Sequence, residues 1–200
     1  MVADLLTALP SYDSDDFLLI GITPPHIFDG EADRITSLLE SGIRLIHLRH
    51  PAASLPEMRA LLEAIPSHLH PRLTLHDSFE LCEAYAIGGV HLNSRNPSLP
   101  DTLKPLADRL RVSRSCHSLH ELADCGAMDY ATLSPIFDSI SKDRYRSGFP
   151  PSSYPQLAQH INECGVRVVA LGGVTAERLP LLHQLNFSGA AMLGALFKPV

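Results

Sequence analysis

Two glycine-containing turns near the end of the chain have the composition of an anion-binding site. The first is Leu171-Gly172-Gly173-Val174 and the second is Met192-Leu193-Gly194. Each follows a short apolar segment typical of a strand, and glycine lets an anion approach main-chain amides closely. The alternative is that the glycines form tight turns and bind nothing. The amides that we expect to hold a phosphate group are those of Gly172, Gly173, Leu193 and Gly194.

A histidine and an arginine end another apolar segment, His47-Leu48-Arg49. Side chains alternate along a strand, so His47 and Arg49 share one side while Ile46 and Leu48 face the other. A buried arginine requires an anionic partner. Its guanidinium group suits a phosphate or carboxylate of a ligand, and an internal salt bridge, with Asp77 as the candidate partner, is an equal alternative.

Two further segments end in residues that can transfer a proton or bind a ligand. His76 and Asp77 follow one strand, although capping of the next helix would by itself explain Asp77. His117 follows Ser115 in Arg114-Ser115-Cys116-His117-Ser118, just before a helix that opens with the S-x-x-E capping box of Ser118 and Glu121. An imidazole at a strand end is a candidate general acid or base, although a single histidine is more often structural.

The longest irregular segment, Ser134–Pro151, is rich in hydroxyls and cations. Loops of this length in a compact domain are often functional lids. Its side chains have the chemistry to surround a phosphate or diphosphate, and the alternative is a solvated loop without a ligand. The residues that we expect to contact a ligand here are Ser139, Ser141 and Lys142.

These residues must be positioned by alternating strands and helices. Apolar segments of strand length alternate with segments that carry apolar residues at helical spacing, which favours a parallel sheet. The predicted strands are Phe17–Ile22, Ile43–Leu48, Arg72–Leu75, Gly89–Leu92, Arg111–Ser115, Tyr130–Leu133, Arg167–Leu171 and Ala190–Leu193. The predicted helices are Glu31–Ser41, Leu55–Ile65, Phe79–Ile87, Thr102–Arg109, Leu119–Cys125, Tyr154–Cys164 and Ala176–Leu185.

Eight such repeats favour an α/β fold of the (β/α)₈ TIM-barrel type. An open doubly wound sheet is the alternative, but no G-x-G-x-x-G follows the first strand. Few residues follow the eighth strand, so we expect the customary eighth helix to be missing. We predict an N-terminal segment over residues 1–16, in which Ala3–Leu9 could cover that gap, and one barrel domain over residues 17–200.

The composition and charge of the chain indicate which kinds of molecule it can bind. The net charge is −6 and the cations are scattered, which argues against nucleic acid and leaves a small anionic metabolite. No apolar run is long enough to cross a membrane, and the first residues lack the features of a signal peptide, so we expect a cytoplasmic protein. The four cysteines show no C-x-x-C spacing and predict reduced thiols. His117 and His120 lack a third ligand, so we expect no zinc site there.

The chain resembles the thiamine phosphate synthase/TenI superfamily over nearly its full length. The resemblance implies a (β/α)₈ barrel in thiamine biosynthesis that handles a phosphorylated thiazole. The sequence leaves the choice between a monomer and a homo-oligomer open. The stretches that carry the resemblance are Leu19-Ile20-Gly21-Ile22-Thr23, Leu45-Ile46-His47-Leu48-Arg49, Gly88-Gly89-Val90-His91-Leu92, Arg114-Ser115-Cys116-His117-Ser118, Ser134-Pro135-Ile136-Phe137 and Ala170-Leu171-Gly172-Gly173-Val174.

Two activities share this resemblance. The synthase joins a pyrimidine diphosphate to the thiazole phosphate with Mg²⁺. Its sequence pattern resembles Gln-x-Arg-x-Lys at the second strand, Asn-Asp at the third and a further Asp after the fourth. This chain keeps Arg49 and Asp77. If the protein is a synthase, Asp77 is the one metal ligand that we expect. It departs from the pattern at His47, Pro51, His76 and Asn96. Losing a carboxylate weakens a Mg²⁺ site.

The TenI pattern instead resembles His-x-Arg and Arg-Ser-x-His-Ser, both present here. Some members of that branch are thiazole tautomerases, with the last histidine as acid or base. Our first hypothesis is therefore a metal-independent tautomerase in which His117 moves the proton and His47, Arg49, His76 and Ser115 bind the ligand. The alternatives are a Mg²⁺-dependent thiamine phosphate synthase and a non-catalytic thiazole phosphate binder.

Overall fold

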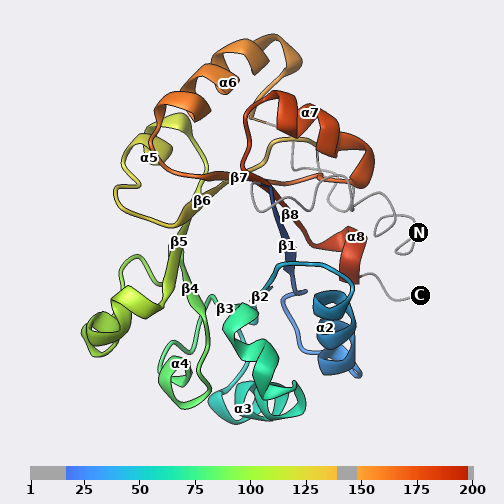
Figure 1. The fold of residues 1–200 in the computed structure, drawn as a ribbon, viewed down its shortest axis with the longest axis vertical. Coiled ribbons are helices and arrows are strands. Elements are labelled where there is room, and N and C mark those ends of the chain that lie inside the picture. Colours follow the sequence, from blue (N-terminus) through green and yellow to red (C-terminus); the bar gives the residue numbers. More distant parts are fainter. Residues whose placement is uncertain (1–16, 139–147, 198–200) are drawn as a thin grey trace.

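A closed barrel of eight parallel strands, in the order β1 to β8, forms the centre of the molecule (Figure 1). The structure is a computed structural model, and it describes residues 17–138 and 148–197. Each strand pairs with its sequence neighbours, and β8 closes the ring against β1. The strands are β1 Leu18–Ile22, β2 Leu45–Leu48, β3 Leu73–Leu75, β4 Gly89–Leu92, β5 Arg111–Cys116, β6 Tyr130–Leu133, β7 Val168–Leu171 and β8 Gly189–Met192.

Helices surround the barrel and connect successive strands (Figure 1). The α-helices are α2 Glu31–Glu40, α3 Leu55–Ala64, α4 Leu81–Ala84, α5 Leu119–Ala123, α6 Tyr154–Glu163, α7 Leu179–Gln184 and α8 Gly194–Phe197. Short 3₁₀ segments supplement them: η2 Ser67–Arg72, η3 Asp101–Arg109, η4 Pro151–Ser153 and η5 Ala176–Arg178. The structure therefore confirms the predicted (β/α)₈ barrel.

Two helical predictions need correction. The segment expected as a helix over Thr102–Arg109 is the 3₁₀ segment η3, with Pro105 inside it; proline cannot donate the backbone bond of an α-helix. The eighth helix is also not missing, because the single turn α8 follows β8. The Arg34 guanidinium of α2 donates to the carbonyl of Leu196 at 2.6 and 3.0 Å, which fixes α8 against α2. The proposed cover Ala3–Leu9, with the rest of residues 1–16, lies outside the described residues.

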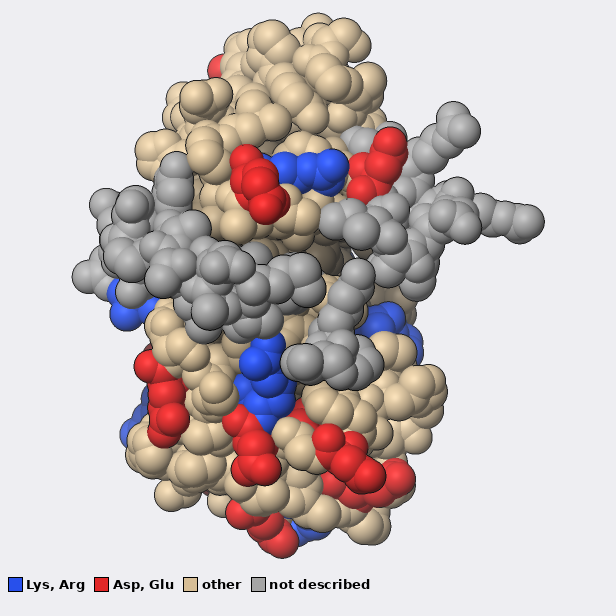
Figure 2. All heavy atoms as spheres, turned by 90° about the vertical axis from the view of Figure 1, so that its right-hand side faces the viewer, with Lys and Arg blue, Asp and Glu red and all other residues tan. Residues whose placement is uncertain are grey.

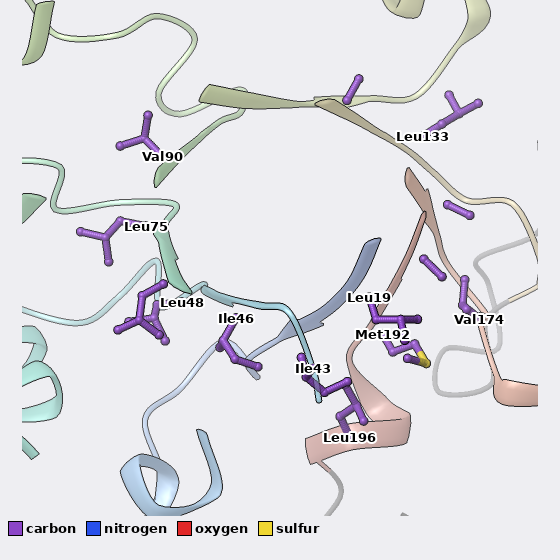
Figure 3. Close-up of a cluster of buried hydrophobic side chains, with 14 of the residues drawn as sticks. Leu19, Ile43, Ile46, Leu48, Leu75, Val90, Leu133, Val174, Met192 and Leu196 are labelled. Carbon is purple, nitrogen blue, oxygen red and sulfur yellow. The ribbon is translucent and has the colours of Figure 1, made fainter. Parts of the chain in front are cut away.

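The core consists of two layers separated by the wall of the barrel. Outward-facing strand residues pack against the helices, and Figure 3 shows Leu48, Leu75, Val90 and Leu133 pointing away from the barrel interior. Burial of each such side chain contributes about 1.5–3 kcal/mol. A second, smaller cluster fills one side of the barrel interior: Ile20, Ile22, Leu45, Tyr130, Val169 and Ala191.

Polar side chains fill the other side of the barrel interior. The strand register brings His47 of β2 beside Thr74 of β3, and His91 of β4 beside Ser113 of β5. All four side chains are buried. Buried polar groups are stabilised by partners, and the side chains of His47, His91 and Ser113 form hydrogen bonds within this half of the interior. The alternation of side chains along β2 to β5 thus produces the candidate site.

The outer surface carries mixed charge on the face formed by α2, α7 and α8. Acidic and basic side chains are interspersed there, without a continuous basic stripe on the atoms drawn in colour (Figure 2). Among residues 17–138 and 148–197, no helix is long and apolar enough to cross a membrane. The four cysteines are free thiols, as the sequence predicts.

Candidate active site

Three buried histidines meet inside the barrel. His47 lies on β2, His76 directly follows β3 and His91 lies on β4, and their exposed fractions are 0%, 5% and 1%. The His47 Nδ1 and His76 Nε2 atoms are 2.9 Å apart. The rings of His76 and His91 stack with centroids 4.3 Å apart, and the His47 ring lies 5.0 Å from each of them. The sequence placed His47 at an open mouth, whereas the structure encloses it.

Hydroxyl groups from β5 and β6 hold two of these rings. The His47 Nε2 atom lies 2.6 Å from the Tyr130 hydroxyl. Both nitrogens of His91 are also bonded: Nδ1 lies 2.8 Å from Ser113 Oγ, and Nε2 lies 2.8 Å from Ser115 Oγ. A hydroxyl can donate or accept, so the network accommodates either neutral tautomer of each ring.

Burial keeps this cluster neutral. It is the main cause that holds the pKa of His47 and His76 well below the ordinary value, with the neighbouring histidines as further causes. For His91, burial lowers the pKa to about 3. Burial likewise raises the pKa of Tyr130 to about 12. The three imidazoles and the phenol are therefore uncharged near neutral pH, which avoids the free-energy cost of burying a charge.

Asp77 pairs with a residue that the sequence analysis did not single out. Its carboxylate accepts two bonds from the Arg95 guanidinium, at 3.1 and 3.0 Å, and one from Asn96 Nδ2 at 3.1 Å. Helix α4 begins at Leu81 with Glu80 as its N-cap, so the predicted capping role of Asp77 is wrong. The suggested Arg49–Asp77 salt bridge is also not formed. The planar guanidinium of Arg95 fits both carboxylate oxygens of Asp77.

The residues around Asp77 do not fit a Mg²⁺ ion. That ion takes an octahedral set of oxygens, with carboxylates as its protein ligands. The oxygens of the Asp77 carboxylate already accept N–H groups from Arg95 and Asn96. Asn96 turns its amide nitrogen, a donor, toward Asp77 and the carbonyl of His76. The guanidinium of Arg95 is the cation that already pairs with this carboxylate.

Arg49 remains a cation without a counter-ion among the residues that the structure describes. Its backbone N–H donates to Thr23 Oγ1 at 2.9 Å, which fixes the end of β2 against the loop after β1. Thr23 also contacts His50 Nε2, which lies 3.0 Å from the buried carboxylate of Glu31. The guanidinium of Arg49 is half-buried beside His76 and is available to an anionic ligand.

His117 lies at the rim, apart from the buried cluster. Its ring is exposed, and Nδ1 lies 3.2 Å from both the carbonyl and the hydroxyl oxygen of Ser134. Half of the predicted capping box forms, because Ser118 Oγ accepts from the Glu121 N–H, while the Glu121 carboxylate accepts from the N–H of His117 instead of Ser118. A pocket of about 340 Å³ adjoins the ring, and its lining includes Ser115 and Arg114. The structure therefore brings His117 and Ser115 to one pocket.

The glycine turn after β7 contacts the loop after β6, and both glycine turns remain predicted anion sites. Gly172 and Gly173 have φ of +94° and +62°. The loop donates the N–H groups of Ile136 and Phe137 to Leu171 and Gly172. Among the residues that the structure describes, no backbone carbonyl is seen to accept from the amides of Gly172, Gly173, Leu193 or Gly194. Ser139, Ser141 and Lys142 lie outside the described residues, so their expected ligand contacts stay predictions.

Substitution of Gly173 by alanine tests how closely the loop approaches this turn. A Cβ atom at Gly173 would lie 2.4 Å from the carbonyl oxygen of Asp138. We expect Gly173→Ala to lower the free energy of unfolding by roughly 2–4 kcal/mol, from a left-handed backbone and overpacking together. Gly126→Ala is the matched control, since Gly126 has φ of +59° and open space around it. Urea unfolding measures both variants, and equal losses would contradict the close approach.

Two features of the site escaped the sequence analysis. His91 lies in β4 and Arg95 lies just after it. The sequence analysis named His91 only within a stretch that carries the family resemblance, and it did not name Arg95. The position of His91, third in a strand whose neighbours point outward, was a usable signal. The buried pair of Glu31 and His50 had none, because the two residues are 19 positions apart, one at the start of α2 and the other in the loop after β2.

Comparison with known proteins agrees with this architecture. A family model described as thiamine monophosphate synthase matches residues 19–196. The thiamine-phosphate synthase of Bacteroides fragilis (strain ATCC 25285) is 26% identical over 167 residues, which cover 80% of this chain and 82% of that protein. A crystal structure of thiamine phosphate pyrophosphorylase from Bacteroides thetaiotaomicron is 32% identical with a TM-score of 0.76, covering 92% of this chain and 86% of that one.

A thiamine phosphate pyrophosphorylase from Pyrococcus furiosus shares the fold, with a TM-score of 0.70 and 21% identity over 90% of this chain and 87% of that one. The names of these relatives describe a transferase, and the preference for the TenI branch remains a prediction. The match over 19–196 covers the barrel from the second residue of β1 through β8, together with the described residues of the site. The chain therefore belongs to the thiamine monophosphate synthase family.

Proposed function

We propose that this protein is a thiamine-phosphate synthase, which joins a pyrimidine diphosphate to a thiazole phosphate. The names of its relatives favour this reaction over the tautomerase that we first expected. The family resemblance supplies the class of both substrates. The geometry of the mouth adds an independent reason to prefer a reaction with two anionic substrates.

Two separate positions at the mouth are suited to anions, and this observation carries the proposal. One is formed by Arg49 after β2 and Arg95 after β4. The other is formed by the amides after β7 and β8, which donate to no backbone carbonyl of the described residues. Strands β5 and β6 separate the β7 turn from Arg95. Two phosphorylated substrates need two such positions, whereas the isomerisation of one thiazole phosphate needs one. We assign the diphosphate to the arginines and the thiazole phosphate to the amides.

The residues of this chain would favour the departure of the diphosphate. The bond between the two rings forms as the diphosphate leaves, so negative charge accumulates on its oxygens. The guanidinium groups of Arg49 and Arg95 stabilise that charge, and Asp77 holds Arg95 in place. Ser115 lines the pocket and would contact the substrate, while the buried His47 and His76 support the wall behind it. No step is assigned to Mg²⁺, because the residues around Asp77 do not fit it.

The direct test is incubation of the purified protein with both substrates, with Mg²⁺ and with EDTA. We expect thiamine phosphate and pyrophosphate to form in equal amounts. Product in neither condition, with saturable binding of thiazole phosphate, would contradict the synthase and favour the non-catalytic binder. Solution scattering on the same preparation would decide between a monomer and a homo-oligomer.

The tautomerase is the second candidate, and the pocket beside His117 favours it. If the protein isomerises the thiazole carboxylate tautomer, we expect His117→Ala to lower that rate by about 10²–10⁴-fold, since a positioned acid or base contributes that much. His120→Ala is the matched control, because His120 is exposed three residues further on. Deuterium exchange from solvent measures the rate. Isomerisation that survives in His117→Ala would exclude His117 as the acid or base.

A further inference from the structure

We propose that His47, His76 and His91 form a binding site for one divalent transition-metal ion, with Zn²⁺ as the best fit. One nitrogen from each ring lies within 4.8 Å of the other two. The three rings come from adjacent strands, β2 to β4, and point into the same part of the barrel interior. The inference concerns a different place from the Asp77 carboxylate, and it does not depend on which reaction the protein catalyses.

The ligand set selects the metal. Three imidazole nitrogens suit Zn²⁺ and its neighbours in the first transition row, whereas Mg²⁺ and Ca²⁺ require oxygen ligands. A metal also requires neutral imidazole, and the burial of these side chains keeps them neutral at physiological pH. Three protein ligands leave a fourth tetrahedral position open, as in catalytic rather than structural zinc sites.

The hydrogen bonds around the cluster correspond to the outer contacts of a histidine metal site. A metal-bound imidazole usually donates its second N–H to a neighbouring acceptor, which fixes the tautomer and the ring. The Tyr130 hydroxyl lies beside His47 Nε2, which leaves His47 Nδ1 for the metal. Ser113 lies beside His91 Nδ1 and fixes that ring in the same way. The other nitrogen of His91 would exchange its Ser115 bond for the metal.

Only small movements separate the present arrangement from a tetrahedral site. With Zn–N bonds near 2.0–2.1 Å, two ligand nitrogens stand about 3.3 Å apart. His47 Nδ1 and His76 Nε2 are 2.9 Å apart, so they must separate by a few tenths of an ångström and lose the proton they share. That proton moves to the second nitrogen of the donor ring when the tautomer changes.

Charge around the cluster determines the fourth ligand. The cations that act on these rings are Arg49, Arg95 and Arg111, and Asp77 follows His76 in the chain. A dication held by three neutral ligands beside these arginines needs an anion to complete its shell. We therefore expect hydroxide, or an anionic oxygen of a bound molecule, in the open position.

Metal binding by tag-free protein tests the proposal without an activity assay. The protein is stripped with a chelator, equilibrated with Zn²⁺ and, separately, Co²⁺, and measured by elemental analysis and visible absorption. We expect one Zn²⁺ per chain, unaffected by excess Mg²⁺, and an intense Co²⁺ spectrum typical of tetrahedral coordination. His47→Gln and His76→Asn should each lower the affinity by at least about 100-fold, because a ligand matters more than the outer contacts whose loss costs 10–100-fold.

These two variants restore residue types found in the synthase pattern at the same positions, so they should fold, and circular dichroism verifies this. His160→Ala, which removes an exposed histidine, is the control and should bind like the wild type. Tyr130→Phe keeps all three ligands and should lose about 10–100-fold in affinity. Absence of stoichiometric Zn²⁺, or Zn²⁺ that persists in both His47→Gln and His76→Asn, would overturn the proposal.

Discussion

Replacement of Arg95 by alanine is expected to lower kcat/KM for the pyrimidine diphosphate by about 10²–10³-fold, the usual cost of losing a donor that stabilises developing negative charge. The guanidinium is held by Asp77 through two bonds at 3.1 and 3.0 Å. Its loss removes a positive charge from the mouth and leaves the Asp77 carboxylate unpaired, which repels the diphosphate. Steady-state kinetics with each substrate varied in turn measures the effect.

The effect should be specific to one substrate and one arginine. KM for the thiazole phosphate should change little, because we assign that ligand to the amides of Gly172, Gly173, Leu193 and Gly194 on the other side of the mouth. Arg95→Lys keeps the charge but not the two-point contact, so we expect an intermediate rate. Arg109→Ala, which removes an exposed arginine from η3, should match the wild type. A rate for Arg95→Ala within about threefold of the control would rule out this role for Arg95.

Acid should destabilise the fold through the histidine cluster, and this is the largest effect that we expect on stability. The pKa of His91 is lowered to about 3, from an ordinary value near 6.5. Between these values the unfolded chain binds a proton that the folded chain does not. The free energy of unfolding therefore falls by about 1.4 kcal/mol for each pH unit of acidification, for this residue alone. His47 and His76, whose pKa values are also lowered, act in the same direction.

The sign of this dependence is fixed by the direction of the shift. A lowered pKa in the folded state gives stability that is complete above about pH 6.5 and is lost as the pH falls toward the folded value. Urea unfolding in EDTA, from about pH 7.5 down to about pH 4.5, measures the slope. The variant His91→Asn should reduce the slope, while His160→Asn should keep it. Equal slopes for His91→Asn and the wild type would show that His91 does not contribute to the loss of stability in acid.

The local sequence determined the architecture because each strand carries its own pattern. Short apolar segments separated by amphipathic ones predicted all eight strands, and the shifts at their ends are small, as at β2, which begins at Leu45 rather than Ile43. Outward-facing Ile46 and Leu48 and inward-facing His47 follow from alternation within one strand. Failures were local too: η3 differs from an α-helix because of Pro105, and α8 was missed because a single turn has too few residues to show periodicity.

The partners of the site residues were decided only by the tertiary structure. The sequence singled out His47, Arg49, His76, Asp77 and His117. It offered Arg49 as one possible partner of Asp77, and the actual partner is Arg95. It also could not show that His91 completes a cluster with His47 and His76. Residues from different strands meet only when the barrel closes, and the side chain that comes closest depends on register and loop path. The sequence thus determined which side chains enter the barrel, and the closure of the barrel decided which of them touch.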